Sequence, residues 1–213
     1  MIQNYIFDFG NVLTVFDPDL LTAPYVADTK TRKLVSEVAF DRLYWDALDW
    51  NTITDEEIKT DICRRLPEEL RAVGCTAYDR WVHNLTPVPG MESLVADLKK
   101  TGAKLYILSN VSIGFANTYK QVPWIRDLFD LFDGIVLSGS IGIAKPGKEI
   151  FEYLLSKFDL QAEESLFIDD NAKNIEAATS TSKIKAVISN VFVAQRFVIP
   201  VINFFELLFW FPF

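Results

Sequence analysis

Apolar residues in the second half of the chain fall into short continuous runs, separated by stretches in which they recur every three or four positions. The runs predict buried strands, and the spaced stretches predict amphipathic helices. The predicted strands are residues 5–7, 103–108, 134–137, 165–168 and 184–188, and the predicted helices are residues 91–100, 113–121, 148–157 and 172–179. Because strands and helices alternate, we predict an α/β core with a parallel sheet covered by helices on both faces.

The segment from residue 17 to about residue 85 has helical spacing and contains no good strand. Thr54 and Glu57 form a candidate capping box at the start of one of its helices. Proline and glycine at 87–90 then break the pattern and mark a hinge. We therefore predict a core made of residues 1–16 and 87–213, with a helical cap domain, residues 17–86, inserted into it.

The C-terminal segment, residues 191–213, is rich in phenylalanine and tryptophan but is interrupted by Pro200, Asn203, Glu206 and Pro212. Since a membrane-spanning helix needs ~20 predominantly apolar residues, we do not expect a transmembrane segment here. We expect this segment to pack on the core or to join two copies in a homo-oligomer. A membrane-surface anchor is the alternative.

Composition narrows the class of ligand and the compartment. A net charge of −8 without any basic run argues against nucleic acid as a partner. A small anionic substrate stays possible, because a bound cation and a few lysines can reverse the local field. Cys63 and Cys75 have no zinc-ligand spacing, and we expect free thiols. With no secretory signal at the N-terminus, we expect a cytoplasmic protein.

Polar residues stand at or just after the predicted strands: Asp8, Ser109, Lys145 and the pair Asp169 and Asp170. Each alone fits a turn, a helix cap or a solvated loop. Together they form a phosphoryl-transfer site, because ligands bind at the carboxyl ends of parallel strands. Asp8 is a candidate nucleophile, the carboxylates suit Mg²⁺, and Lys145 and the Ser109 hydroxyl can hold phosphate oxygens.

Four strings resemble, in order, the motifs of the haloacid dehalogenase superfamily. They are Asp8-Phe9-Gly10-Asn11-Val12-Leu13, Leu105-Tyr106-Ile107-Leu108-Ser109-Asn110, Lys145-Pro146, and Phe167-Ile168-Asp169-Asp170-Asn171-Ala172-Lys173-Asn174. The resemblance implies a Rossmann-like core, Mg²⁺ as cofactor, an aspartyl-phosphate intermediate, and a small four-helix cap that closes over the site and selects the substrate.

The resemblance also implies a role for each site residue. Asp8, Ser109 and Lys145 are catalytic, and Ser109, Asn110 and Lys145 bind the phosphoryl group. The metal ligands are Asp8, the Gly10 carbonyl and Asp170, with Asp169 supporting them. Asn174 orients Lys145 or the metal shell.

One position departs from the commonest family pattern. A second Asp usually stands two residues after the nucleophile and serves as general acid and base, but this chain has Gly10 there. This form resembles a branch that includes glucose-1-phosphate phosphatases. Asp17 and Asp19 are candidate replacements, although Asp17 before Pro18 also fits a simple turn. His83 fits a packed or surface position better than a catalyst.

We therefore predict a phosphatase that hydrolyses a small phosphorylated metabolite, such as a sugar phosphate. The cap aromatics Tyr44, Trp45 and Trp50 fit a core role, with stacking on a sugar as the alternative. A dehalogenase, a phosphotransferase or mutase, and a non-catalytic binding module are the competing hypotheses. The paired acids Asp169 and Asp170 argue against a metal-free dehalogenase, because they repel Asp8 unless a cation lies between them.

Overall fold

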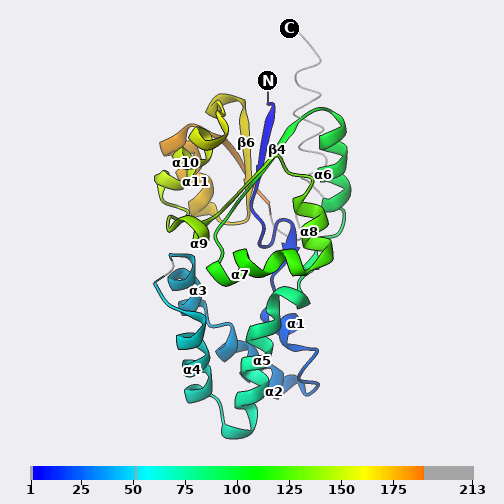
Figure 1. The fold of residues 1–213 in the computed structure, drawn as a ribbon, viewed down its shortest axis with the longest axis vertical. Helices are drawn as coiled ribbons and strands as arrows, with labels where there is room; N and C mark the ends of the chain where they lie inside the picture. The colour runs from blue at the N-terminus through cyan, green and yellow to red at the C-terminus, as the bar shows by residue number, and fades with distance from the viewer. Residues whose placement is uncertain (1, 51, 190–213) are drawn as a thin grey trace.

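A computed structural model describes residues 2–50 and 52–189. Its centre is a five-stranded parallel sheet in the order β5-β4-β1-β6-β7 (Figure 1). The strands are β1 (Asn4–Phe7), β4 (Lys104–Ser109), β5 (Gly134–Leu137), β6 (Ser165–Asp169) and β7 (Lys185–Ile188). β1 is buried at all four positions, as expected for a central strand of a parallel sheet. All five lie at or within one residue of the predicted positions.

The core helices cover both faces of this sheet. On one face α10 (Lys148–Phe158) and α11 (Ala172–Ser182) pack on Ile6 and Phe167. On the other face α6 (Met91–Lys100), α7 (Ile113–Thr118) and α8 (Pro123–Phe129) pack on Phe7 and Ile107. Successive residues of one strand therefore enter different apolar clusters, as the two-residue period of a strand requires.

Two details of the predicted core differ from the structure. The predicted helix 113–121 is α7 followed by a 3-10 turn, η1 (Tyr119–Gln121), and a second 3-10 turn, η2 (Ala162–Glu164), precedes β6. α8 and α9 (Ser138–Ile141) were not predicted. Both are too short to show a clear helical period in the sequence.

The inserted segment is helical, as predicted. It consists of α1 (Pro18–Thr22), α2 (Thr29–Ala39), α3 (Arg42–Asp49), α4 (Asp55–Arg65) and α5 (Glu68–Asn84). The capping box of Thr54 and Glu57 is confirmed at the start of α4. Where the chain enters and leaves the insert, β2 (Thr14–Val15) pairs antiparallel with β3 (Thr86–Pro87). The insert therefore joins the sheet through two adjacent connections.

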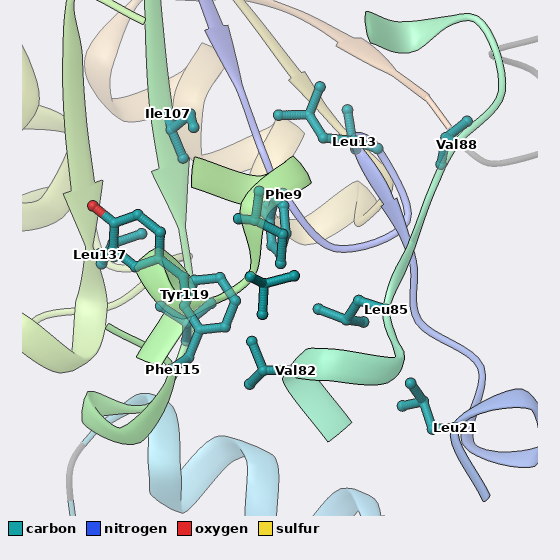
Figure 2. Close-up of a cluster of buried hydrophobic side chains, with 14 of the residues drawn as sticks. Phe9, Leu13, Leu21, Val82, Leu85, Val88, Ile107, Phe115, Tyr119 and Leu137 are labelled. Atoms are coloured by element: carbon teal, nitrogen blue, oxygen red, sulfur yellow. The ribbon is translucent and has the colours of Figure 1, made fainter. Parts of the chain in front are cut away.

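The insert and the sheet share one apolar core. Leu21, Val82 and Leu85 of the insert and its connection belong to the same buried cluster as Phe9 and Phe115 of the sheet layer (Figure 2). Figure 1 shows α1 to α5 beyond the end of the sheet near α7 and α9. This shared core places α3 and α5 over the strand ends.

Two further sequence predictions concern membranes and thiols. Over the described ranges, no helix is long and apolar enough to cross a membrane. The aromatic segment 191–213 lies outside the described residues, so its predicted packing stays a prediction. Cys63 and Cys75 are free, with their Sγ atoms 3.2 Å apart between α4 and α5.

Candidate active site

Asp8 lies in the turn that follows β1. Its backbone N–H donates to the Ile168 carbonyl at 2.9 Å, which ties the turn to the end of β6. Asn11 continues the turn with a positive φ of 53°, a conformation that Asn tolerates better than most residues. The Asn11 side chain donates to Asp170 Oδ2 at 3.2 Å and accepts from the Phe16 N–H at 3.1 Å. Asn11 thus joins the two acidic loops, a role that its place in the sequence does not reveal.

Lys145 lies between two carboxylates at the strand ends. Its Nζ is 2.7 Å from Asp169 Oδ2 and 2.9 Å from Asp8 Oδ1, and the residue is only 3% exposed. A buried cation in such a position stabilises the site only with close carboxylate partners. The structure therefore brings together three of the predicted residues, from the loops after β1 and β5 and from the end of β6.

Asp169 is held from several sides. Besides Lys145, the Asn174 amide donates to both Asp169 oxygens at 3.0 Å, and the Asn171 backbone N–H donates to Oδ1 at 2.7 Å. Asp169 is fully buried. Asn174 thus orients Lys145 indirectly, by fixing the carboxylate that Lys145 contacts.

Asn110 fixes the loop that carries Lys145. Its side-chain amide donates to the Lys145 carbonyl, and its Oδ1 accepts from the Lys145 N–H, both at 2.8 Å. Both polar atoms of this side chain are therefore engaged with the backbone of Lys145. Asn110 lines the cavity, but its side chain positions Lys145, so the predicted contact with substrate stays a prediction.

Burial and charge set the protonation of the site. Burial and the charge of Asp169 raise the pKa of Asp8 to about 6, although Lys145 and the Ser109 hydroxyl oppose this rise. Burial and the same Asp169 charge raise the pKa of Asp170. Burial acts to lower the pKa of Lys145, but Asp169 and Asp8 outweigh it and raise that pKa. Lys145 is therefore a permanent cation, and the carboxylates favour a further positive charge nearby.

The acidic residues fit a divalent cation. Asp8, Asp169 and Asp170 each offer a carboxylate oxygen, and these oxygens lie within 4.8 Å of one another. Asp8 Oδ1 is buried, and the Lys145 ammonium, 2.9 Å away, is its ion-pair partner. Hard oxygen ligands of this kind suit Mg²⁺. Asp8 and Asp170 are the more available ligands, since Lys145 and Asn174 already engage Asp169.

The predicted replacements for the missing acid and base are not at the site. Asp17 is exposed and accepts from the backbone N–H groups of Asp19 and Leu20 as the N-cap of α1. Asp19 pairs with Arg32 at 2.9 Å. His83 is exposed in the last turn of α5. Asp17 caps α1 and does not line the cavity, so its role as acid and base stays a prediction.

A cavity of about 700 Å³ opens over the strand ends. The core contributes Asp8, Gly10, Asn11, Asn110, Lys145, Asp170 and Asn174 to its lining. The insert and its connections contribute Phe16, Pro18, Phe40, Arg42, Trp45, Asp49, Trp50 and Trp81. Tyr44 does not line it, because its hydroxyl contacts Asp61 and Arg65 instead. Trp45 and Trp50 do line it.

The chain belongs to the haloacid dehalogenase-like hydrolase family, whose model matches residues 2–180. This result confirms the predicted family and fold class. The chain is 28% identical over 183 residues to the sesquiterpene phosphatase astK of Aspergillus oryzae, covering 84% of this chain and 86% of that protein. It is also 28% identical over 190 residues to a D-ribitol-5-phosphate phosphatase of Bacteroides thetaiotaomicron, covering 82% and 86%.

A solved structure shows the same fold. The HAD family enzyme bt-2542 of Bacteroides thetaiotaomicron, in complex with magnesium and inorganic phosphate, matches with a TM-score of 0.65 and 22% identity over 90% of this chain and 96% of that one. Both curated relatives are phosphatases, and the acidic cluster of this chain can hold a metal ion.

Proposed function

We propose that this protein is a magnesium-dependent phosphatase that hydrolyses a small phosphate monoester through phosphorylated Asp8. One observation carries the proposal. Lys145 lies between Asp8 and Asp169, with Asp170 beside them, at a cavity large enough for an organic phosphate. The two phosphatases to which the chain is similar act on different organic groups and share the phosphate ester.

The chain's own residues define two half-reactions. A carboxylate oxygen of Asp8 attacks phosphorus, and the ester oxygen leaves with the bonding electrons and takes up a proton. Water then attacks the phosphoryl group on Asp8, releases phosphate and restores the carboxylate. Lys145 and the Ser109 hydroxyl hold nonbridging oxygens during both steps. When bound by Asp8, Asp170 and the Gly10 carbonyl, magnesium would neutralise phosphate charge and orient the ester.

The proton transfers need a group that Gly10 does not provide. In the part of the chain that the structure describes, Asp49 is the carboxylate of the helical insert that lines the cavity. Asp49 ends α3, next to Trp50, whose ring lies 3.8 Å from where a Cβ at Gly147 would be. This contact places the end of α3 beside the Lys145 loop. We therefore propose Asp49 as the general acid and base.

The division into domains is part of the same proposal. We propose that residues 17–86 act as a cap over a core of residues 1–16 and 87–213. The pairing of β2 with β3 supports these limits, because both connections to the insert pass through it. A cap hinged there can expose the cavity to substrate and then exclude water during phosphoryl transfer.

Location and assembly are further proposals. The free thiols Cys63 and Cys75 support a reducing compartment, and we propose the cytoplasm. We also propose a homo-oligomer that uses residues 191–213, which a sedimentation experiment on the full chain and on a chain ending at Ser189 would test.

The competing functions predict different results in activity assays. A dehalogenase would work in excess chelator, a phosphotransferase would need an acceptor other than water, and a binding module would show no turnover. The test is a phosphatase assay over a panel of phosphate esters, with and without Mg²⁺. Asp8→Asn should remove turnover while keeping the fold, and Asp17→Asn, an exposed control outside the cavity, should retain it. Full activity in Asp8→Asn or in chelator would refute the proposal.

A further inference from the structure

Five aromatic side chains of the insert and its entry segment line the cavity: Phe16, Phe40, Trp45, Trp50 and Trp81. We call these five side chains the aromatic wall. The Phe16 ring centroid lies 5.0 Å from that of Trp45, 5.8 Å from that of Trp81 and 6.2 Å from that of Phe40. Most of these rings meet edge to face, an arrangement that favours a fixed packing. The wall is therefore a preformed apolar surface.

The position of the wall makes it the binding surface for the organic part of the ester. It comes from the insert and its entry segment, whereas the phosphate-binding groups lie on the loops of the sheet. Trp50 reaches the loop that follows Lys145, as its 3.8 Å approach to a Cβ at Gly147 shows. An ester with its phosphoryl group at Asp8 and Lys145 therefore directs its alcohol along the wall.

Each hydroxyl and amide side chain that lines the cavity makes at least one hydrogen bond within the protein, whereas the Trp45 indole N–H is buried and has no partner among the described residues. Thr14 donates to the Thr86 carbonyl at 2.9 Å, and the Ser112 hydroxyl accepts from the Phe115 N–H at 3.0 Å. Asn11 bonds to Asp170 and to the Phe16 N–H, and Asn110 bonds to the Lys145 backbone. Asn171 accepts from the Lys173 N–H, and Asn174 donates to Asp169. A polyol would lose water from several hydroxyls here and recover few hydrogen bonds.

We infer that the preferred substrate is a phosphate monoester of a large apolar alcohol, rather than a sugar or polyol phosphate. The inference rests on the proposed phosphatase function and deepens it. It also revises the expectation of a sugar phosphate, because a surface made of aromatic rings, with few polar groups such as the Trp45 indole N–H, binds hydrocarbon better than several hydroxyl groups. Arg42 and Asp49 lie on the same face of α3 as Trp45, at spacings of three and four residues, and provide charge beside the wall.

The test compares two esters with equal carbon number, 1-hexyl phosphate and glucitol 6-phosphate, on the full chain with Mg²⁺. Each buried methylene group raises affinity about fourfold, and each hydroxyl group that is buried without a partner lowers it. We therefore expect kcat/KM to be about a hundredfold or more higher for hexyl phosphate. Lengthening the alkyl chain from three carbons should raise kcat/KM by roughly two- to fourfold per carbon until the wall is covered.

Variants then ask whether the wall sets this preference. Trp45→Ala, Trp81→Ala and Trp50→Ala should each lower the ratio of the two kcat/KM values, by about tenfold for the first two. The ratio does not depend on how much of a preparation is folded, and Trp50 is 46% exposed, so its variant should fold. Leu43→Ala is the matched control, because Leu43 lies on α3, is 80% exposed and does not line the cavity.

The outcomes separate this inference from the proposed function. Equal hydrolysis of both esters, or preference for glucitol 6-phosphate, would overturn the apolar substrate class and leave the phosphatase function intact. A preference for hexyl phosphate that all three tryptophan variants retain would overturn the role of the wall. If neither ester nor acetyl phosphate is hydrolysed with Mg²⁺, the proposed function itself fails, and the inference fails with it.

Discussion

Removing the charge of Lys145 should slow catalysis and also destabilise the protein, and these effects can be separated. Lys145 lies 2.9 Å from Asp8 and 2.7 Å from Asp169, and it is almost fully buried. Loss of one preorganised donor to a transition state costs about 2.7–4 kcal/mol, so Lys145→Met should lower kcat by roughly 10²–10³-fold. Loss of one partner of a buried ion pair costs about 3–5 kcal/mol of folding stability.

The double variant Lys145→Met with Asp169→Asn distinguishes the two effects. It removes one buried carboxylate together with the cation, so it should recover much of the stability lost in Lys145→Met. It should not recover turnover, because no cation faces the phosphoryl group. Urea unfolding gives the folding stability and steady-state kinetics give kcat, both on the same preparations. A double variant with restored activity would show that Lys145 acts only by neutralising Asp169, and a drop below threefold in Lys145→Met would refute its phosphate contact.

Other predictions concern the acid and base, the pH profile and the Lys145 loop. Gly10→Asp should fold, because a Cβ there meets no atom within 4 Å, and it should raise the steady rate of Asp49→Asn by supplying a second carboxylate near Asp8. Asp49→Asn should slow the steady rate by roughly 10²-fold, and an unchanged steady rate would exclude it as the acid and base. At limiting Mg²⁺, kcat/KM should fall as the pH drops through about 6, because Asp8 attacks only when deprotonated and its pKa is raised to about 6. Saturating Mg²⁺ should move this fall to lower pH, since the cation competes with the proton. Asn110→Ala should lower kcat about tenfold, because the Lys145 backbone loses two hydrogen bonds that hold it in place. The ratio of kcat/KM between two esters with different alcohols should stay unchanged.

The sequence was sufficient for the fold and for the residues that meet at the strand ends. Strands and helices of the core have strong periodicity, and the rule that ligands bind at strand ends predicts that Asp8, Ser109, Lys145 and Asp170 lie close together. The family match confirms this fold. Two-residue strands such as β2 and one-turn helices such as α9 carry no such periodic signal.

The sequence was insufficient for the roles of polar side chains, because their partners lie far away along the chain. Asn110 and Lys145 are 35 positions apart, and Asn11 and Asp170 are 159 apart. An Asp before a proline fits either an acid at the cavity or a helix N-cap, and the structure shows an N-cap at Asp17. The aromatic wall was equally hidden, since core and cavity tryptophans have similar spacing in sequence.

The most direct test of the central claim is to identify the phosphorylated residue during turnover. Rapid mixing of the full chain with substrate and Mg²⁺, followed by acid quenching and peptide mass spectrometry, should show one added phosphoryl group on the peptide that contains Asp8. The same experiment on Asp8→Asn should show none. Turnover of a phosphate ester by the wild type with no modification of Asp8, or with the phosphoryl group on another residue, would contradict the account.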